Sequence, residues 1–233
     1  MGVGMKERPI LFSTEMVRAL LDGRKTMTRR LVKPQPSKDD YTLWTQNGGD
    51  KKDNGKHRWG KVLNNLLEAD KEMFSCPYGQ IGDILWVRET WADLRGMGFS
   101  IDDFPRLVAY KADSKDEGLE IAKEYGIKWK PSIFMPRSAS RISLRITNIR
   151  VERLNDITEE DAIREGVEKN IEPGQESKWE PDYGYKDYTA KDLDGFPCFT
   201  AIDSFKSLWG SINGENSWAE NPWVWVIEFE VIA

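Results

Sequence analysis

The chain has 233 residues, a formal net charge of −5 and a mean hydropathy of −0.61. Its length is enough for one large domain or two small ones. The negative charge argues against non-specific binding to long DNA, which depends on many phosphate contacts, but it leaves room for a locally basic pocket. We therefore expect a small nucleoside or nucleotide, or a short RNA, as the partner. The sequence leaves the oligomeric state open.

The two cysteines, Cys76 and Cys198, lie far apart and form no CxxC motif. That spacing is typical of reduced thiols in a cytosol rather than of a disulfide scaffold. No apolar run approaches the ~20 residues that a membrane span needs. The first residues also lack the apolar segment of a signal peptide. We therefore expect a cytoplasmic protein without a membrane partner.

The N-terminal part of the chain predicts a strand, a helix and a second strand. Residues 8–12 form a short apolar run that contains Pro9, which is typical of an edge strand. Ser13 can cap a helix with one apolar stripe, and Gly23 is a natural end for it. Residues 26–32 then predict a strand that carries polar and basic side chains.

Three polar stretches are expected to be insertions into a single domain of residues 1–233, because strands continue on both sides of each. They span residues 34–80, 91–130 and 168–197. Within them we expect a short helix over residues 62–74, a strand over 106–110 and an acidic helix over 114–125.

The remaining segments predict further strands over residues 84–90, 141–154 and 223–232. Thr158 begins a short helix that Gly166 ends, and an amphipathic helix is expected over residues 199–209. Strands and short helices mix without a βαβ rhythm. This order favours an α+β fold, built on a small mixed or antiparallel β-barrel with flanking helices, over a doubly wound sheet.

Histidine chemistry has little support, because the chain contains a single histidine, His57, in a polar stretch where we expect a solvated loop residue. A Ser-His-Asp triad and a histidine-rich zinc site both need a different set of residues. The sequence also has no GxGxxG or Walker A motif. We expect neither a metal nor a cofactor, which leaves Lys, Thr, Ser, Tyr and carboxylates as candidate catalytic groups.

The densest cluster of such groups is the segment Gly23-Arg24-Lys25-Thr26-Met27-Thr28-Arg29-Arg30. On a strand, side chains at 26, 28 and 30 share one face, and those at 27 and 29 share the other. Lys25 can approach Thr28 only if it lies in the turn between helix and strand, which Gly23 favours. From spacing alone, a solvated basic edge is a simpler explanation than a functional site, because charge runs usually lie on a wet surface.

This segment resembles the G-R-K-T-x-T-x-R signature of ASCH domains, which are relatives of the PUA RNA-binding barrel. Weaker matches follow in order at Gly82-Asp83-Ile84-Leu85-Trp86-Val87, at Thr158-Glu159-Glu160-Asp161-Ala162-Ile163-Arg164-Glu165, and in the closing strand over 224–231. The resemblance implies a PUA-like barrel. In length, the chain resembles the larger ASCH proteins that phages and prophages carry. Two of its segments resemble segments of that group, Val87-Arg88-Glu89-Thr90-Trp91 and Met135-Pro136-Arg137-Ser138-Ala139-Ser140-Arg141.

Some compact bacterial ASCH proteins are amidohydrolases of N4-acetylcytidine, and the resemblance carries their catalytic roles to Lys25, Thr28 and Glu165. A threonine hydroxyl needs a base to take its proton, and a desolvated lysine can be that base. A glutamate can deliver a proton to the leaving amine. Arg30 is expected to hold the pyrimidine carbonyl or a developing oxyanion, and Arg24 and Thr26 are expected to contact the substrate. The insertions imply a larger lid or a different substrate.

Further candidates for substrate binding are Glu89, Trp91 and Arg137. Glu89 and Trp91 alternate on a strand, so they are either a polar group beside a stacking ring or a structural ion pair beside a core tryptophan. Arg137 is either a phosphate ligand or the partner of one of the 39 acidic residues.

Two classes of function remain open. The first is an enzyme that hydrolyses an acyl–amine bond in a modified, cytidine-like nucleoside. The second is a non-catalytic module that binds RNA or a modified base. Such a module needs aromatic rings and a basic rim but no nucleophile, so Lys25, Thr28 and Glu165 together favour the enzyme.

Overall fold

The computed structural model describes residues 5–46, 55–98, 100, 102, 107–113, 123, 125–169, 184–190 and 198–232. It confirms an α+β protein that is rich in strands and has few helices. The main sheet has five strands in the order β1-β6-β9-β10-β2. Their bounds are Glu7–Leu11 for β1, Ile84–Arg88 for β6, Ser143–Arg153 for β9, Trp223–Val231 for β10 and Met27–Leu31 for β2. The pair β1–β6 is parallel and the other pairs are antiparallel.

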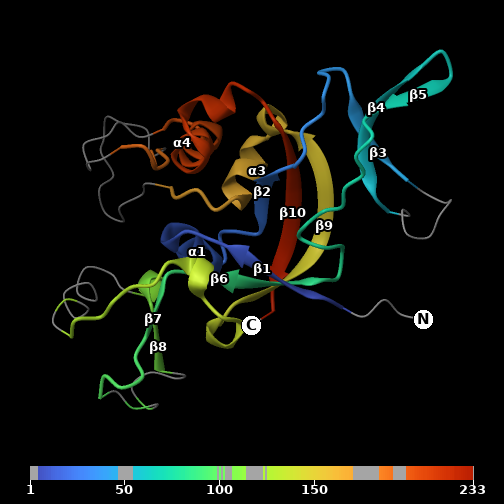
Figure 1. The fold of residues 1–233 in the computed structure, drawn as a ribbon. Helices are drawn as coiled ribbons and strands as arrows, with labels where there is room; N and C mark the ends of the chain where they lie inside the picture. The colour runs from blue at the N-terminus through green and yellow to red at the C-terminus, as the bar shows by residue number, and fades with distance from the viewer. Residues whose placement is uncertain are drawn as a thin grey trace.

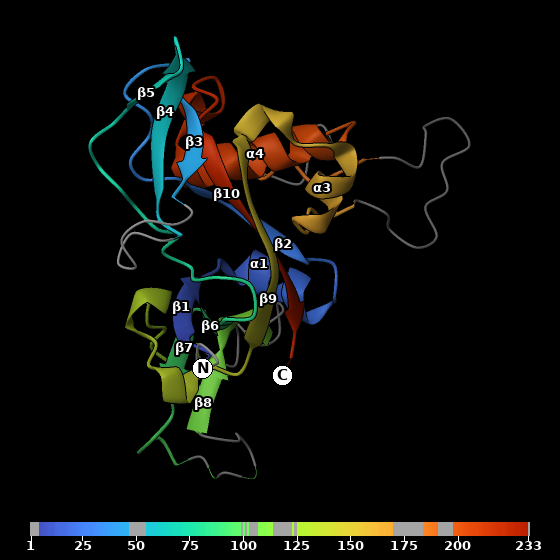
Figure 2. The same cartoon turned by 90° about the vertical axis from the view of Figure 1, so that its right-hand side faces the viewer.

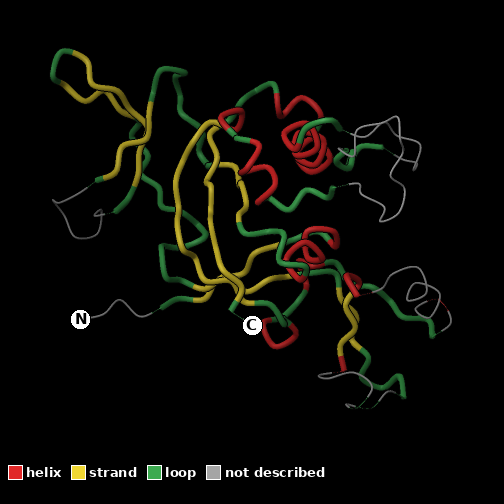
Figure 3. Tube along the Cα trace, turned by 180° about the vertical axis from the view of Figure 1, so that it is seen from behind, coloured by secondary structure: helices red, strands yellow, loops and turns green. Residues whose placement is uncertain are grey.

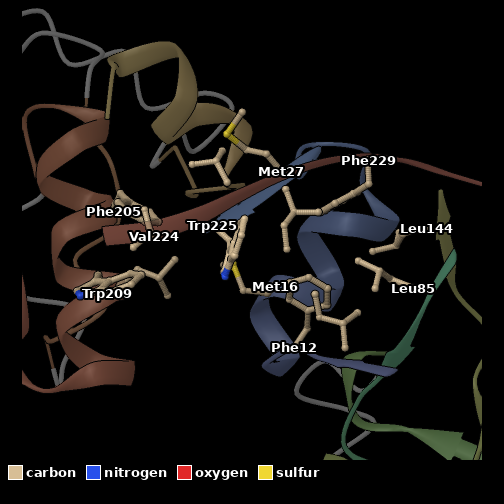
Figure 4. Packing of buried hydrophobic residues seen from close by; sticks show 14 of the residues in the cluster. Phe12, Met16, Met27, Leu85, Leu144, Phe205, Trp209, Val224, Trp225 and Phe229 are labelled. Atoms are coloured by element: carbon tan, nitrogen blue, oxygen red, sulfur yellow. The ribbon is translucent and has the colours of Figure 1, made fainter. Parts of the chain in front are cut away.

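The expected closed barrel is not formed, because β1 and β2 remain as two edges of the sheet in the described part of the chain. Helix α1 (Thr14–Leu21) connects these edges, and its buried face includes Met16 and Leu20. Figure 4 shows Met16 beside Phe12, the residue that follows β1. The helix takes up room that direct pairing of the two edges would need. The side chain of Arg30 reaches across instead, and its Nη2 donates to the carbonyl oxygen of Leu11 at 2.7 Å.

Two further α-helices, α3 (Glu159–Arg164) and α4 (Ala201–Asn213), lie together on one side of the sheet (Figures 1 and 2). Each begins with a threonine cap: Thr158 accepts from the backbone N–H of Asp161, and Thr200 accepts from that of Asp203. Short 3-10 helices occupy several connections. Their bounds are Lys111–Asp113, Ser132–Phe134, Arg137–Ala139, Leu154–Asp156 and Glu215–Trp218.

The first insertion is folded into a sheet of its own, and the helix expected over residues 62–74 is wrong. Strands β3 (Thr42–Thr45), β4 (His57–Leu63) and β5 (Leu66–Ala69) form an antiparallel sheet on the other side of β9 and β10 from α4 (Figure 1). Asn64 and Asn65 have positive φ values of 50° and 62°. Two such residues make the tight turn that joins twisted strands into a hairpin, so the chain reverses where a helix would continue.

The second insertion contains strands β7 (Trp91–Asp93) and β8 (Val108–Tyr110), which pair with each other. Most of the acidic helix expected over residues 114–125, and most of the third insertion, lie outside the described residues. The long curved strands β9 and β10 pair with each other along most of their length and form the centre of the main sheet (Figure 3). Among the described residues, no helix is long and apolar enough to cross a membrane.

The placement of His57 corrects the expectation of a solvated loop residue. His57 lies on β4, and its ring packs against Trp225 at a centroid distance of 5.3 Å and against Phe74 at 6.0 Å. Strand β4 is the central strand of its sheet, and it carries the ring to the face that meets β10. This burial lowers the pKa of His57 below its usual value of 6.5.

We expect His57 to destabilise the protein at mildly acidic pH. In the unfolded chain the imidazole takes up a proton as the pH falls through 6.5, whereas the folded protein resists protonation until a lower pH. The free energy of unfolding therefore decreases as the pH falls below 6.5. Urea unfolding at pH 7.5 and pH 5.5 should show a smaller loss of stability in His57→Gln than in the unsubstituted protein. An equal loss of stability in both proteins would contradict a lowered pKa of His57.

Candidate functional site

A cavity of about 610 Å³, here called the first cavity, lies at the opening between β1 and β2. The end of β1, helix α1, strand β2, the residue after α3 and helix α4 all contribute to its wall. The polar groups in that wall include Lys25, Thr28, Arg29, Arg30 and Glu165. The structure thus brings together the three residues expected to be catalytic, although Glu165 lies 140 positions from Lys25 in the chain.

The turn after α1 determines where Lys25 lies. Helix α1 ends at Leu21 with Asp22 as its C-cap, and Gly23 has a φ of 72° that reverses the chain direction. The backbone N–H groups of Arg24 and Lys25 both donate to the carbonyl oxygen of Ala19, at 2.9 and 3.0 Å. Lys25 is therefore in the turn before β2, as its approach to Thr28 requires.

The Lys25 ammonium is buried, and both of its hydrogen bonds go to one residue. Its Nζ donates to the Oε2 of Glu165 at 2.8 Å and to the backbone oxygen of Glu165 at 2.6 Å. Only 2% of the Lys25 surface is exposed. Burial lowers the pKa of Lys25, and the opposing attraction of Glu165 only partly offsets it. A lysine in this position can give up its proton more easily than one in water.

Thr28 is the candidate nucleophile, and it lies on β2 opposite Ile227 of β10. It is 3% exposed and contributes to the wall of the first cavity. Its hydroxyl makes no hydrogen bond to another described residue. A ligand in the cavity can therefore reach a hydroxyl that the rest of the described structure does not engage.

Arg29 is the residue at this site whose role was not predicted from the sequence. Its guanidinium is buried and contacts three carboxylates: Glu152 at 2.5 Å, Asp161 at 2.7 Å and Glu165 at 3.3 Å. Desolvation alone would lower the pKa of Arg29, but the three carboxylates together raise it. Strand spacing places Arg29 on the face opposite Thr28. The spacing does not reveal that acidic residues of β9 and α3 surround that face.

The contacts of Arg29 continue into a network of ion pairs. Arg150 binds Glu152, Asp161 and Glu228, and Arg164 binds Glu228. The network contains four cations and four anions, so its formal charge is zero. Its members are Lys25, Arg29, Arg150, Arg164, Glu152, Asp161, Glu165 and Glu228. Each charge of the network has at least one partner of opposite sign, which the buried members Lys25, Arg29 and Glu165 require.

Two of the expected substrate contacts fasten the turn instead of lining the cavity. Arg24 donates to the backbone oxygen of Gly166 at 2.9 Å and pairs with Asp22. The hydroxyl of Thr26 accepts from the Nε of Arg164 at 3.3 Å. Both contacts tie the turn before β2 to the end of α3, which helps to hold Lys25 beside Glu165.

Glu89, Trp91 and Arg137 also do not line the first cavity. Glu89 is buried and forms a two-pronged ion pair with Arg141, at 2.9 and 3.1 Å. Trp91 is buried in a small apolar cluster. Arg137 pairs with Glu7 at the surface, at 2.8 Å. The arrangement matches the structural alternative for these three residues, and their binding roles stay predictions.

Comparison with known proteins gives no relative to which this site can be aligned. No family model, no curated protein and no solved structure matches the chain. Within the described residues, no group of three or more His, Cys, Asp or Glu side chains is placed to hold a metal ion. The resemblance to ASCH domains rests on the sequence motifs alone.

Gly166 is expected to be indispensable for the position of Lys25. It has a φ of 87°, and a Cβ there would lie 2.8 Å from Lys25 Cβ and 2.9 Å from Ala19 Cβ. Gly23 has a similar φ of 72°, but no atom lies within 4 Å of its Cβ position. Gly23→Ala should cost about 1–2 kcal/mol through backbone strain alone. Gly166→Ala should have the same strain cost and, in addition, an overpacking cost of roughly 1–3 kcal/mol. Urea unfolding measures both variants. Equal losses of stability in Gly23→Ala and Gly166→Ala would show that the contact of Gly166 with Lys25 and Ala19 is unimportant.

Removing the Arg29 guanidinium should destabilise the protein strongly. Arg29→Met keeps much of the side-chain volume but leaves three carboxylates without their shared cation, which we expect to cost about 3–5 kcal/mol. Arg145, which pairs with Glu230 at the surface, provides the control, and Arg145→Met should cost about 1 kcal/mol or less. Urea unfolding of both variants measures the difference. Similar losses would mean that the network contributes no more than a surface pair.

Proposed function

We propose that this protein is an ASCH-type amidohydrolase that acts on an N-acylated, cytidine-like nucleoside in the first cavity. One observation carries the proposal: Lys25 and Thr28, from the turn before β2 and from β2 itself, line the same cavity as the distant Glu165. The cavity volume of about 610 Å³ is in the range of small-molecule sites, roughly 300–1,000 Å³. Within this proposal, the main sheet corresponds to a PUA-like barrel that stays open between β1 and β2.

The reaction would begin at the Thr28 hydroxyl. Its oxygen attacks the carbonyl carbon of the acyl group, while Lys25 in its neutral form takes the hydroxyl proton. The negative charge that develops on the carbonyl oxygen is met by the Arg30 guanidinium, which lies in the same cavity wall. The burial that lowers the pKa of Lys25 makes its neutral form more accessible than that of a lysine in water.

The second half of the reaction would release the amine. The bond between the carbonyl carbon and N4 breaks, and N4 receives the proton that Lys25 had taken. Glu165, which contacts the Lys25 Nζ at 2.8 Å, is placed to pass that proton on. The acyl group is then an ester of Thr28, and attack by water frees the carboxylic acid and restores the hydroxyl. The products are cytidine and one carboxylic acid.

A non-catalytic binding module is the second candidate, and a specific contact favours it. The Lys25 ammonium and the Glu165 carboxylate satisfy each other without a ligand. A pair of this kind can serve as a buried cross-link between the turn before β2 and the end of α3. The aromatic residues Phe12 and Tyr78 also line the cavity, and such rings can hold a base without any reaction.

Turnover of N4-acetylcytidine separates the two candidates. The unsubstituted protein should release acetate, and Thr28→Ala should abolish the release because it has no nucleophile. Thr28→Ser keeps a hydroxyl and should keep measurable turnover. Lys25→Met should lower kcat/KM by about 10²–10⁴, the usual contribution of a general base. Chromatography of cytidine against N4-acetylcytidine measures the rates, and circular dichroism checks that each variant is folded.

Undiminished turnover by Thr28→Ala would eliminate the threonine mechanism. If the protein turns over no acylated nucleoside but its melting temperature rises when one is added, the binding module is the better description. A ligand that binds only the native state stabilises it, and the stabilisation grows with ligand concentration.

A further inference from the structure

A second cavity, of about 750 Å³, lies between the main sheet and the β3–β5 sheet. Lys6, Arg8 and Lys56 contribute cationic side chains to its wall, and Val151 and Trp225 belong to its apolar wall. The proposed hydrolysis uses none of these five residues. A cavity with this composition calls for its own explanation, because the chain as a whole is acidic.

The two cavities are neighbours. One short segment separates them: Pro77 and Tyr78 line the first, whereas Cys76 and Gly79 line the second. They also meet on the main sheet. Arg30 lines the first cavity, and its partner in the β2–β10 ladder, Trp225, lines the second. Residues that face each other across antiparallel strands are only about 5 Å apart. A ligand that occupies both cavities would have to cross residues 76–79.

The Nε of Arg8 is a buried donor in the wall of the second cavity that has no acceptor among the described residues. The guanidinium forms no ion pair with another described residue. Eight other arginines of the described part are paired with carboxylates. Gly79 lets the chain pass close to both Asp83 and Arg8, since a Cβ there would lie 2.5 Å from the Asp83 Oδ2 and 3.2 Å from the Arg8 Nε.

The charges around this group favour an anionic ligand. Asp83 also lines the cavity, but both of its carboxylate oxygens accept backbone hydrogen bonds. Its Oδ1 accepts from the backbone N–H of Lys6 at 3.0 Å, and its Oδ2 accepts from the backbone N–H of Gln80 at 3.2 Å. Arg150 lines the cavity as well, and its guanidinium is committed to the ion-pair network. The formal charges of Lys6, Arg8 and Asp83 add up to +1, and Lys56, which has an interaction of its own, also lines the cavity. Arginine and lysine side chains in such a setting are typical phosphate ligands.

We propose that the second cavity binds phosphate groups of the ligand whose base occupies the first cavity. The substrate is then a phosphate-bearing chain, either a nucleotide or a short single-stranded oligonucleotide, and not a free nucleoside. The inference rests on the proposed function only in placing the base in the first cavity. Single-stranded ligands are commonly held in this way, with phosphates in a basic groove and bases against rings.

The test compares three probes: N4-acetylcytidine, its 5′-triphosphate and a pentanucleotide with one central N4-acetylcytidine. Equilibrium binding of each is measured with the Thr28→Ala protein, so that no probe is consumed. The variant Lys6→Gln/Arg8→Gln removes two cations from the second cavity. Arg95→Gln/Arg145→Gln removes two cations that line neither cavity and is the matched control.

At least one phosphate-bearing probe should bind tenfold or more tightly than the nucleoside, and the Lys6/Arg8 variant should abolish most of that gain. For the pentanucleotide, the dependence of log Kd on log salt should become shallower by about 0.7 for each phosphate that the variant no longer neutralises. Nucleoside binding and the control variant should show no such change. A gain with the triphosphate alone identifies a nucleotide ligand, and a gain with the pentanucleotide alone identifies an oligonucleotide.

Equal binding of all three probes, or equal effects of the two double variants, would overturn the phosphate site and leave the proposed hydrolysis intact. The experiment also distinguishes the opposite case, in which the phosphate site holds and the proposed hydrolysis fails. Phosphate-dependent binding that needs Lys6 and Arg8, without any turnover by the unsubstituted protein, would support the second cavity and remove the amidohydrolase.

Discussion

The buried guanidinium of Arg29 is the contact on which the rest of the described structure depends. It lies on β2, and its carboxylate partners come from β9, from the first turn of α3 and from the residue that follows α3. An unpaired charge at this depth would cost several kcal/mol, because the surrounding protein cannot solvate it as water does. Strand β2 and helix α3 therefore have few ways to pack against β9. The arrangement that satisfies Arg29 is the one that also puts Glu165 beside Lys25.

The same constraint determines the charge of the candidate site. Glu165 is shared between Arg29 and Lys25, so neither cation has this carboxylate to itself. Burial, and then the nearby positive charges of Arg30 and Arg29, lower the pKa of Lys25. A lone Lys–Glu pair would keep its proton more firmly on the lysine. The network thus supplies a physical reason for a lysine that exchanges its proton readily, which the proposed reaction needs and a purely structural cross-link does not.

The sequence was most informative where local patterns determine structure. The caps at Ser13 and Thr158, the breaks at Gly23 and Gly166 and the apolar strands all occur where the sequence pattern predicts them. The sequence reading failed where two short polar residues decided the outcome, since Asn64 and Asn65 turn the chain into a hairpin within a stretch whose composition suggests a helix. It also failed for Arg29. A strand pattern shows which face a side chain occupies, but it does not show which distant carboxylates meet that face.

The missing barrel closure and the first cavity have the same cause. In a closed barrel β1 would pair with β2, and backbone hydrogen bonds would close the gap between the two edges that the Arg30 side chain now spans. Helix α1 holds the two edges apart, and the Arg30 side chain spans them. Edge strands with unpaired backbone groups are a hazard for aggregation unless something covers or uses them. Here the opening is lined by buried ions and rings, and it adjoins a second, basic cavity along residues 76–79. The feature that departs from the expected fold is therefore the feature that makes room for a ligand.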